Sequence, residues 1–543
     1  MLKKSLLITI KRYLSLKYIP NQLGLLSFFM GLPLLFPGGA ISAEKIFISY
    51  GPLDFSVSVE SLEIYATEGR ITKEFATYAN FLEPQQLTSL QNLLKQPADL
   101  NVVAIAQFFY SPQGQIILNK LGEIIQTKAG QNGFYALRSA LILAAADEEG
   151  LTVLNVLKKF PTYGIRINSQ QGLAVFRDLN QMIVQTENAI ALLEQQSLIQ
   201  AYTAPFSNPL PDIRTPGNIS FTQEQLILQD TSRRRQFPAE VYLPQLPEKY
   251  PLPLIIISHG LGSDLNSFAY LASHLASYGF AVAVLEHPGS NAQQIQGLLT
   301  GLEGEVTPPQ ELIDRPLDIK YLLDQLEINF REKINTQEVG IIGQSFGAYT
   351  ALVLAGAQIN WQELNQNCPP LQNSLNISLL IQCLGLNAQL PSANEALQDK
   401  RIVAVMAINP LTSIIFGESQ LSKIKAPVMF ISGSADTVTP ALTEQIKPFS
   451  WLTTINKYLV LMEKATHFST LGESVNTTEN ASIPVPSQAI GPDPNIAHTY
   501  IKALSLAFMK THLSQDQTYQ NYLHAAYTQS ISQELMPLYF LTK

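Results

Sequence analysis

The stretch Val339–Gly356, VGIIGQSFGAYTALVLAG, constrains the fold of this chain more than any other. Its first residues are apolar and predict the end of a buried strand, and the residues after Gly347 are typical of a helix. Between these two patterns, Ser345 stands in the sequence G-x-S-x-G. At a tight strand-to-helix turn, this sequence projects a serine hydroxyl over the end of a sheet, with a helix N-terminus behind it. The sequence therefore predicts a nucleophilic serine at position 345 in an α/β fold.

A nucleophilic serine needs a general base within hydrogen-bond reach, and the base needs an acid that orients it. His467 stands in EKATHFST, directly after the last strand pattern, and Asp436 stands in FISGSADTVTP, after the strand before it. Loops at the carboxyl ends of strands are where such sheets collect their reactive groups. The order serine, aspartate, histidine also matches this type of site. We expect His467 to be the base and Asp436 the acid; the alternative for Asp436 is an ordinary turn aspartate.

A second loop is suited to stabilising the oxyanion that forms when a serine attacks a carbonyl. The backbone N–H after the serine, here that of Phe346, is one donor in this type of site, and an earlier strand–helix loop supplies the other. The loop SHGLGSD follows the buried strand at 254–257. Because Gly260 and Gly262 let the backbone approach a ligand closely, we expect the N–H of Leu261 to be the second donor.

Two further histidines stand at strand ends on the same side of the predicted sheet. His259 belongs to the SHGLGSD loop, where it is more typical of a side chain that braces the loop than of a base. His287 ends the strand pattern FAVAVLEH. Both are candidates for lining the substrate pocket.

The residues around these motifs predict an α/β domain over 219–515. ISFTQEQLIL and PAEVYLP alternate as strands do, and PLIIISHG is the continuous apolar run of a strand buried on both faces. Strand and helix patterns then alternate along the domain, which predicts a mostly parallel, twisted sheet with helices on both faces. Insertions at 288–312 and 357–400 mix apolar residues with Gly, Pro and amides, and we expect them to form a lid or pocket wall.

A chain of 543 residues is too long for one ordinary core, so more than one domain is expected. Residues 44–200 predict a mainly helical domain that begins with a hairpin, KIFISY and FSVSV. This stretch contains no histidine, which makes an active site within it unexpected. Four prolines mark 201–218 as a linker, and 516–543 predict a C-terminal helix and tail.

Residues 1–43 have the form of a secretory signal. They carry five basic residues and no acidic one, an apolar core at Leu23–Phe36, and the small residues GGAISA before Glu44. We expect export to the periplasm or out of the cell, with the mature chain beginning near Glu44. The alternative is an uncleaved N-terminal membrane anchor.

The two cysteines of the chain, Cys368 and Cys383, lie close together in NCPPLQNSLNISLLIQCLG. Two cysteines in an exported chain favour one disulfide. A pair of buried thiols is the alternative.

Charge and residue spacing narrow the range of partners. A formal charge of −8 argues against a nucleic-acid partner. No group of Cys and His has metal-ligand spacing, so we expect neither a metal nor another cofactor. The expected partner is a small-molecule or lipid ester, with contact to a membrane surface or the cell envelope as a further option.

The motifs SHGLG and GQSFG, with a histidine after the last strand, resemble the α/β-hydrolase superfamily. Within it they are most similar to the secreted platelet-activating-factor acetylhydrolase type, over about residues 230–470. The resemblance implies a serine esterase that needs no metal and hydrolyses phospholipids with short or oxidised sn-2 acyl chains. The domain at 44–200 is similar to one of unassigned function that precedes such hydrolases in bacterial proteins.

The sequence departs from the acetylhydrolases at the acid. In that family the acid follows the strand after the nucleophile helix, where this chain has VMAINP with Asn409. The acid is then expected at Asp436, the position more usual across the superfamily, which weakens the inference of a phospholipid substrate but not that of ester hydrolysis. The dienelactone hydrolases are also similar, but their nucleophile is a cysteine. Alternatives are an envelope lipase or polyester depolymerase, and a non-catalytic binding protein that retains the hydrolase shell.

Overall fold

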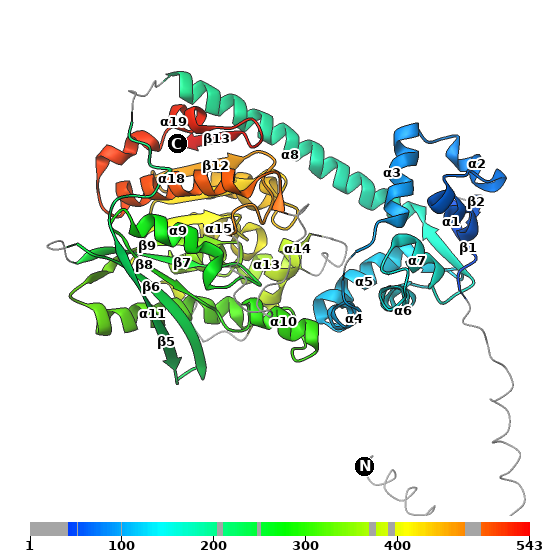
Figure 1. Cartoon of the computed structure of the whole chain (residues 1–543), viewed down its shortest axis with the longest axis horizontal. Helices are drawn as coiled ribbons and strands as arrows, with labels where there is room; N and C mark the ends of the chain where they lie inside the picture. The colour runs from blue at the N-terminus through cyan, green and yellow to red at the C-terminus, as the bar shows by residue number, and fades with distance from the viewer. Residues whose placement is uncertain are drawn as a thin grey trace, which may run out of the picture.

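The computed structural model describes residues 42–50, 53–98, 100–203, 210–246, 251–368, 376–388, 397–472 and 490–542. They form two regions, each built on its own sheet and joined by the long helix α8 (Ser169–Thr203), as Figure 1 shows. Residues 1–41 of the predicted signal segment lie outside the described residues. Within the described ranges, no helix combines the length and the apolar character needed to cross a membrane.

The first region surrounds a four-stranded sheet with the order β2-β1-β4-β3. The predicted hairpin is present, because β1 and β2 pair antiparallel. The region is not purely helical, however: β4 runs parallel to β1, and β3 pairs antiparallel with β4. These strands lie far apart in the chain, so a local pattern could not reveal their pairing. The strands are β1 (Lys45–Tyr50), β2 (Leu53–Ser58), β3 (Ile125–Thr127) and β4 (Gly164–Asn168).

Helices pack around this small sheet and share one hydrophobic core with it. Ala43, the last residue of the predicted signal segment, is buried in the same core. The helices are α1 (Val59–Glu68), α2 (Lys73–Ala79), α3 (Pro84–Lys95), α4 (Val102–Tyr110), α5 (Pro112–Ile124), α6 (Phe134–Ala145) and α7 (Val153–Lys158).

The second region is built on a nine-stranded sheet with the order β13-β12-β11-β10-β9-β7-β8-β6-β5. The strands from β8 through β12 are parallel to one another, while β5, β6 and β13 run antiparallel to their neighbours. The predicted mostly parallel sheet is therefore confirmed. β13 was not predicted, because it lies in the stretch expected to be a tail. The strands are β5 (Phe221–Asp230), β6 (Arg235–Pro244), β7 (Leu252–Ser258), β8 (Ala281–Leu285), β9 (Ile334–Gln344), β10 (Ile402–Ile408), β11 (Val428–Gly433), β12 (Lys457–Met462) and β13 (Leu538–Thr542).

Helices cover both faces of this sheet, as the alternating pattern predicted. One core lies against α9 (Ala269–Ala276), α18 (Pro494–His512) and α19 (Ala525–Ile531). The other lies against α11 (Glu311–Phe330), α12 (Phe346–Leu354) and α15 (Ser413–Leu421). Every residue of β8 and of β11 is buried, which explains their continuous apolar sequences.

Helix α8 covers the free edge of β13. The hydroxyl of Ser197 accepts a hydrogen bond from the N–H of Phe540 at 3.0 Å. The side-chain amide of Gln200 accepts from the N–H of Thr542 at 3.2 Å and donates to its carbonyl at 3.0 Å. An uncovered edge strand is a template for pairing with another chain, and these side chains satisfy the groups that would do so.

The first region also contacts the second through α4 and α10 (Ala292–Thr300), which lie side by side in Figure 1. Helix α10 belongs to the predicted insertion 288–312 and ends at Gly301, which has φ +80°. A Cβ at this glycine would lie 2.7 Å from Nε2 of Gln107 on α4. The first region therefore packs closely against an insertion that leaves the sheet at the end of β8.

Candidate active site

Ser345 occupies the turn between β9 and α12, with the backbone angles φ 56° and ψ −117°. A positive φ at a serine costs on the order of 1–3 kcal/mol and persists only where the surrounding structure enforces it. The two flanking glycines explain how it is enforced. A Cβ at Gly343 would lie 2.2 Å from the carbonyl oxygen of Gly347, and a Cβ at Gly347 would lie 2.0 Å from that of Ser258. No side chain fits at either position, so the turn can close tightly beneath the serine.

The structure brings the three residues predicted to form the triad together. Nε2 of His467 lies 2.9 Å from Oγ of Ser345, and Nδ1 of His467 lies 2.7 Å from Oδ2 of Asp436. The three side chains follow β9, β11 and β12, and all three residues are at least 95% buried. A histidine that can accept from a serine on one side and donate to a carboxylate on the other is arranged for general-base catalysis.

Neighbouring groups fix the carboxylate of Asp436. Its Oδ1 accepts from the backbone N–H groups of Val438 at 2.8 Å and Thr439 at 2.7 Å. Its Oδ2 accepts from the hydroxyl of Thr439 at 2.8 Å as well as facing His467. The turn-aspartate geometry considered as an alternative is therefore present, and it orients the second oxygen toward the imidazole.

Asn409 follows β10 and does not replace Asp436 as the partner of the imidazole Nδ1. It has φ 47°, and its Oδ1 accepts from the N–H of Gly433 at 3.1 Å. Its backbone carbonyl oxygen lies 3.2 Å from the hydroxyl oxygen of Thr439. Asn409 thus braces the loop that carries Asp436.

The glycine-rich loop after β7 passes directly against the nucleophile. A Cβ at Gly260 would lie 3.3 Å from Cβ of Ser345 and 2.1 Å from Oε1 of Gln344. Phe346 begins α12, so its N–H is one of those that find no acceptor within the helix. The assignment of Leu261 and Phe346 as the two oxyanion donors stays a prediction. The close contact between this loop and Ser345 is compatible with it.

The sequence predicts that His259 and His287 line the substrate pocket, but the structure places both side chains in the interior, among the loops. Both are completely buried, with both ring nitrogens in hydrogen-bond contact. Nε2 of His259 accepts from the N–H of His287 at 3.1 Å, so its Nδ1 carries the proton and donates to the carbonyl of Gly260 at 2.6 Å. Burial, followed by the charge of Arg315, holds both pKa values well below the ordinary range. These neutral rings brace the loops after β7 and β8.

A buried charged cluster beneath these loops was not predicted from the sequence. Arg235 pairs with Glu311 at 2.7 Å and with Asp318 at 2.8 Å, and Nδ1 of His287 contacts the same aspartate at 3.1 Å. Burial raises the pKa of Glu311 to about 7, although Arg235 lowers it. One feature of the sequence indicates that these carboxylates lie together: the spacing of Glu311, Asp314 and Asp318 places them on one face of a helix. A charged helix face is normally exposed, which is why this spacing did not suggest burial.

The insertion at 357–400 contains a cross-link. Cys368 and Cys383 form a disulfide with their Cα atoms 5.7 Å apart, which ties the end of α13 (Trp361–Asn367) to α14 (Ile377–Cys383). Residues 369–375 and 389–396 of this insertion lie outside the described residues. The described part packs against the core beside α12 and α15.

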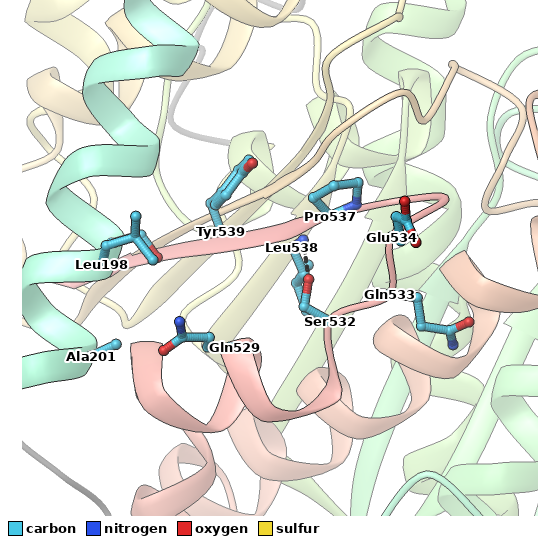
Figure 2. Close-up of a pocket in the computed structure, with 10 residues that line it drawn as sticks. Leu198, Ala201, Gln529, Ser532, Gln533, Glu534, Pro537, Leu538 and Tyr539 are labelled. Atoms are coloured by element: carbon cyan, nitrogen blue, oxygen red, sulfur yellow. Dashed lines mark hydrogen bonds between the residues drawn. The ribbon is translucent and has the colours of Figure 1, made fainter.

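Two cavities between α8 and the edge of the large sheet lie away from Ser345. One, of about 280 Å³, is bounded by α8, α19 and the turn before β13; Figure 2 shows Leu198, Gln529 and Tyr539 around it. The other, of about 410 Å³, lies between α8 and α16 (Lys447–Trp451). Neither cavity is lined by a residue of the triad. Both belong to the packing of α8 on the sheet.

Comparisons with known proteins agree with this architecture. The family described as "Alpha/beta hydrolase of unknown function" matches residues 42–168, which form the first region. The family described as "alpha/beta hydrolase fold" matches residues 253–368, from β7 to the end of α13. The platelet-activating factor acetylhydrolase of Cavia porcellus is 28% identical over 188 residues, which are 34% of this chain. The match spans 40% of the length of that relative.

The second family match includes both the loop at Gly260 and the turn at Ser345, the two segments that the fold brings against each other. The sheet order and the helices on both faces extend the same architecture beyond the matched residues. The second region therefore has the α/β-hydrolase fold, and the chain is similar to the platelet-activating factor acetylhydrolase type.

Proposed function

We propose that the protein is a carboxylic ester hydrolase with Ser345 as nucleophile. The observation that carries this proposal is the hydrogen-bonded chain from Ser345 through His467 to Asp436, with separations of 2.9 Å and 2.7 Å. The strained backbone at Ser345 supports it, because such strain is concentrated at functional sites.

The proposed reaction has two halves. Oγ of Ser345 attacks the ester carbonyl while Nε2 of His467 takes its proton, and the N–H groups of Leu261 and Phe346 stabilise the oxyanion. His467 then protonates the departing alcohol, which leaves an acyl group on Ser345. Water, activated by the same imidazole, releases the acid and restores the serine. Asp436 keeps the proton of the neutral imidazole on Nδ1 and stabilises the imidazolium that forms in each half.

We propose short-chain acyl esters as substrates, including phospholipids with a short sn-2 acyl chain. The similarity to a platelet-activating factor acetylhydrolase supports this class. Each buried methylene adds only about 0.8 kcal/mol, so the end of the pocket selects chain length. We expect kcat/KM to peak at acyl chains of roughly two to six carbons, because the similarity to an acetylhydrolase implies a pocket that ends early and so withholds the gain per methylene from longer chains. A nitrophenyl ester series tests this, and a maximum at long chains with activation at a lipid interface would favour a lipase instead.

Labelling with a fluorophosphonate separates an enzyme from a binding protein that retains the hydrolase shell. The native protein should label at Ser345, and Ser345→Ala should neither label nor hydrolyse nitrophenyl acetate. The melting temperature of this variant should stay near that of the wild type, because the change removes one hydroxyl and leaves the backbone conformation of the turn as it is. Full hydrolysis by Ser345→Ala would assign the activity to another residue.

We also propose that the chain is exported. The basic segment, the apolar core and the small residues before Glu44 support this. Sequencing of the exported protein should give an N-terminus near Glu44. A mature protein that retains Met1 would instead support an N-terminal membrane anchor.

A further inference from the structure

Arg315 of α11 is completely buried and is among the largest side chains in the interior. Its Nη2 donates to the carbonyl of His259, its Nη1 to the hydroxyl of Ser290 at 2.8 Å, and its Nε to the hydroxyl of Thr350 at 3.3 Å. These oxygens belong to the loop after β7, the loop after β8 and helix α12. One guanidinium therefore joins three segments that converge behind Ser345.

Two of its contacts reach the two halves of the predicted oxyanion hole. The carbonyl of His259 belongs to the peptide that precedes Gly260 and Leu261. The guanidinium carbon lies 4.6 Å from the centre of the Phe346 ring, within the range of a cation–π contact. We propose that Arg315 is a positioning residue that holds the N–H groups of Leu261 and Phe346 at the separation required by one oxyanion. This inference rests on the proposed function of Ser345.

The charge environment of Arg315 argues against a purely architectural role. Arg235, in the same cluster, pairs directly with Glu311 and Asp318. Across the described parts of the chain, Arg315 forms no direct ion pair: its hydrogen-bond acceptors are neutral oxygens, and the carboxylates of Glu311 and Asp318 favour its charge from a longer distance. Burial of this cation costs desolvation that no direct ion pair offsets, and apolar side chains could fill the same volume. Because this cation lies beside the predicted oxyanion hole, it can position the donors of that hole, a role that an apolar side chain of the same volume could not fill.

The geometry requires a guanidinium rather than any cation. A planar fork can donate in several fixed directions while its face lies on an aromatic ring, whereas an ammonium is a point charge with a different reach. Arg315→Lys should therefore release at least one of the loops, because an ammonium cannot reach all three acceptors and the ring at once. The oxyanion forms only after attack, so the loss should appear in kcat and leave KM unchanged.

The experiment compares Arg315→Lys with Arg235→Lys. Arg235 is a partly buried arginine of the same cluster and does not contact either oxyanion segment directly. For Arg315→Lys we expect kcat on nitrophenyl acetate to fall at least about tenfold, and by no more than the roughly 10²- to 10³-fold that complete loss of one oxyanion donor costs. The affinity for phenylboronic acid, which forms a tetrahedral adduct on a serine, should fall by a similar factor. Arg235→Lys should lower the melting temperature and change kcat less than about threefold, because the contacts of Arg315 with the two oxyanion segments are left in place.

A second variant covers the case in which Arg315→Lys does not fold. Phe346→Leu retains the backbone N–H but removes the ring from beneath the guanidinium, and it should lower kcat and boronate affinity together. Unchanged kcat and boronate affinity in a folded variant would overturn the inference, whatever the change in melting temperature. A wild-type protein that neither labels with a fluorophosphonate nor hydrolyses the ester would instead refute the proposed function of Ser345.

Discussion

The hydrogen bonds of Asp436 determine what happens when its carboxylate becomes an amide. Two backbone N–H groups occupy Oδ1, so the amide oxygen of Asp436→Asn stays there and the NH2 group takes the place of Oδ2. That group donates to Nδ1 of His467, which forces the imidazole proton onto Nε2, facing Ser345. A base in this tautomer cannot accept the proton of the serine. We expect kcat to fall by about 10⁴, as for the corresponding change in serine proteases, and steady-state kinetics on a nitrophenyl ester would measure it.

Asn409 provides the matched control for this prediction. Asn409→Ala loses the hydrogen bond to Gly433 and places an alanine in the left-handed region, which costs roughly 1–2 kcal/mol. The melting temperature should fall while kcat stays within about tenfold of wild type, since the imidazole keeps its partner. A larger loss of kcat in Asn409→Ala than in Asp436→Asn would show that the acid is misassigned.

The residues that meet in the proposed triad were predictable because each follows a strand pattern and the strands are parallel. Chain order then identified which serine, aspartate and histidine lie together. Arg315 was not predictable, because its partners come from three segments far apart in the sequence and its own surroundings, RPLDIKYLLDQL, are typical of an amphipathic helix. Whether a charged residue of such a helix faces solvent or the loops of the site is decided by the tertiary packing.

At the level of elements, the disulfide between Cys368 and Cys383 stabilises the insertion beside the nucleophile helix. In the chain-entropy model, a closed loop of this size contributes about 3 kcal/mol to the free energy of unfolding. Replacing both cysteines by serine should lower that free energy by about 3 kcal/mol. Denaturant titration of the variant, and of the wild type with and without reductant, measures the effect. Two alkylated cysteines in native, unreduced protein would contradict the cross-link.

Some elements of the fold depend on long-range pairing. β4 and β13 are five residues each and lack a turn partner beside them in the chain, so neither forms a hairpin that a local pattern would reveal. Each is defined by a strand far away in sequence, β1 or β12. The parallel strands of the large sheet were predictable, in contrast, because burial on both faces makes them continuously apolar.

At the scale of the whole molecule, a chain of contacts connects the first region to the loop after β7. Gln107 of α4 lies against Gly301 at the end of α10. The start of α10 is joined to the loop after β7, because the N–H of Ala292 donates to the carbonyl of Ser263 at 3.0 Å. The N–H of Gly262 likewise donates to the carbonyl of Ser290 at 2.9 Å, just before α10. A displacement of α10 by the first region would therefore reach the loop that carries Leu261.

Gly301 and Gly304 offer a matched pair to test this connection. A Cβ at Gly301 would lie 2.7 Å from Nε2 of Gln107, so that the end of this side chain would have to move, and it would strain a backbone with φ +80°, whereas a Cβ at Gly304 meets no atom within 4 Å. We expect Gly301→Ala to lower kcat several-fold and Gly304→Ala to leave it unchanged. In the double variant Gln107→Ala/Gly301→Ala the contact with Gln107 is relieved but the backbone strain remains, so kcat should recover while the melting temperature stays low. If Gly301→Ala lowers only the melting temperature, the first region stabilises the hydrolase region without influencing its site.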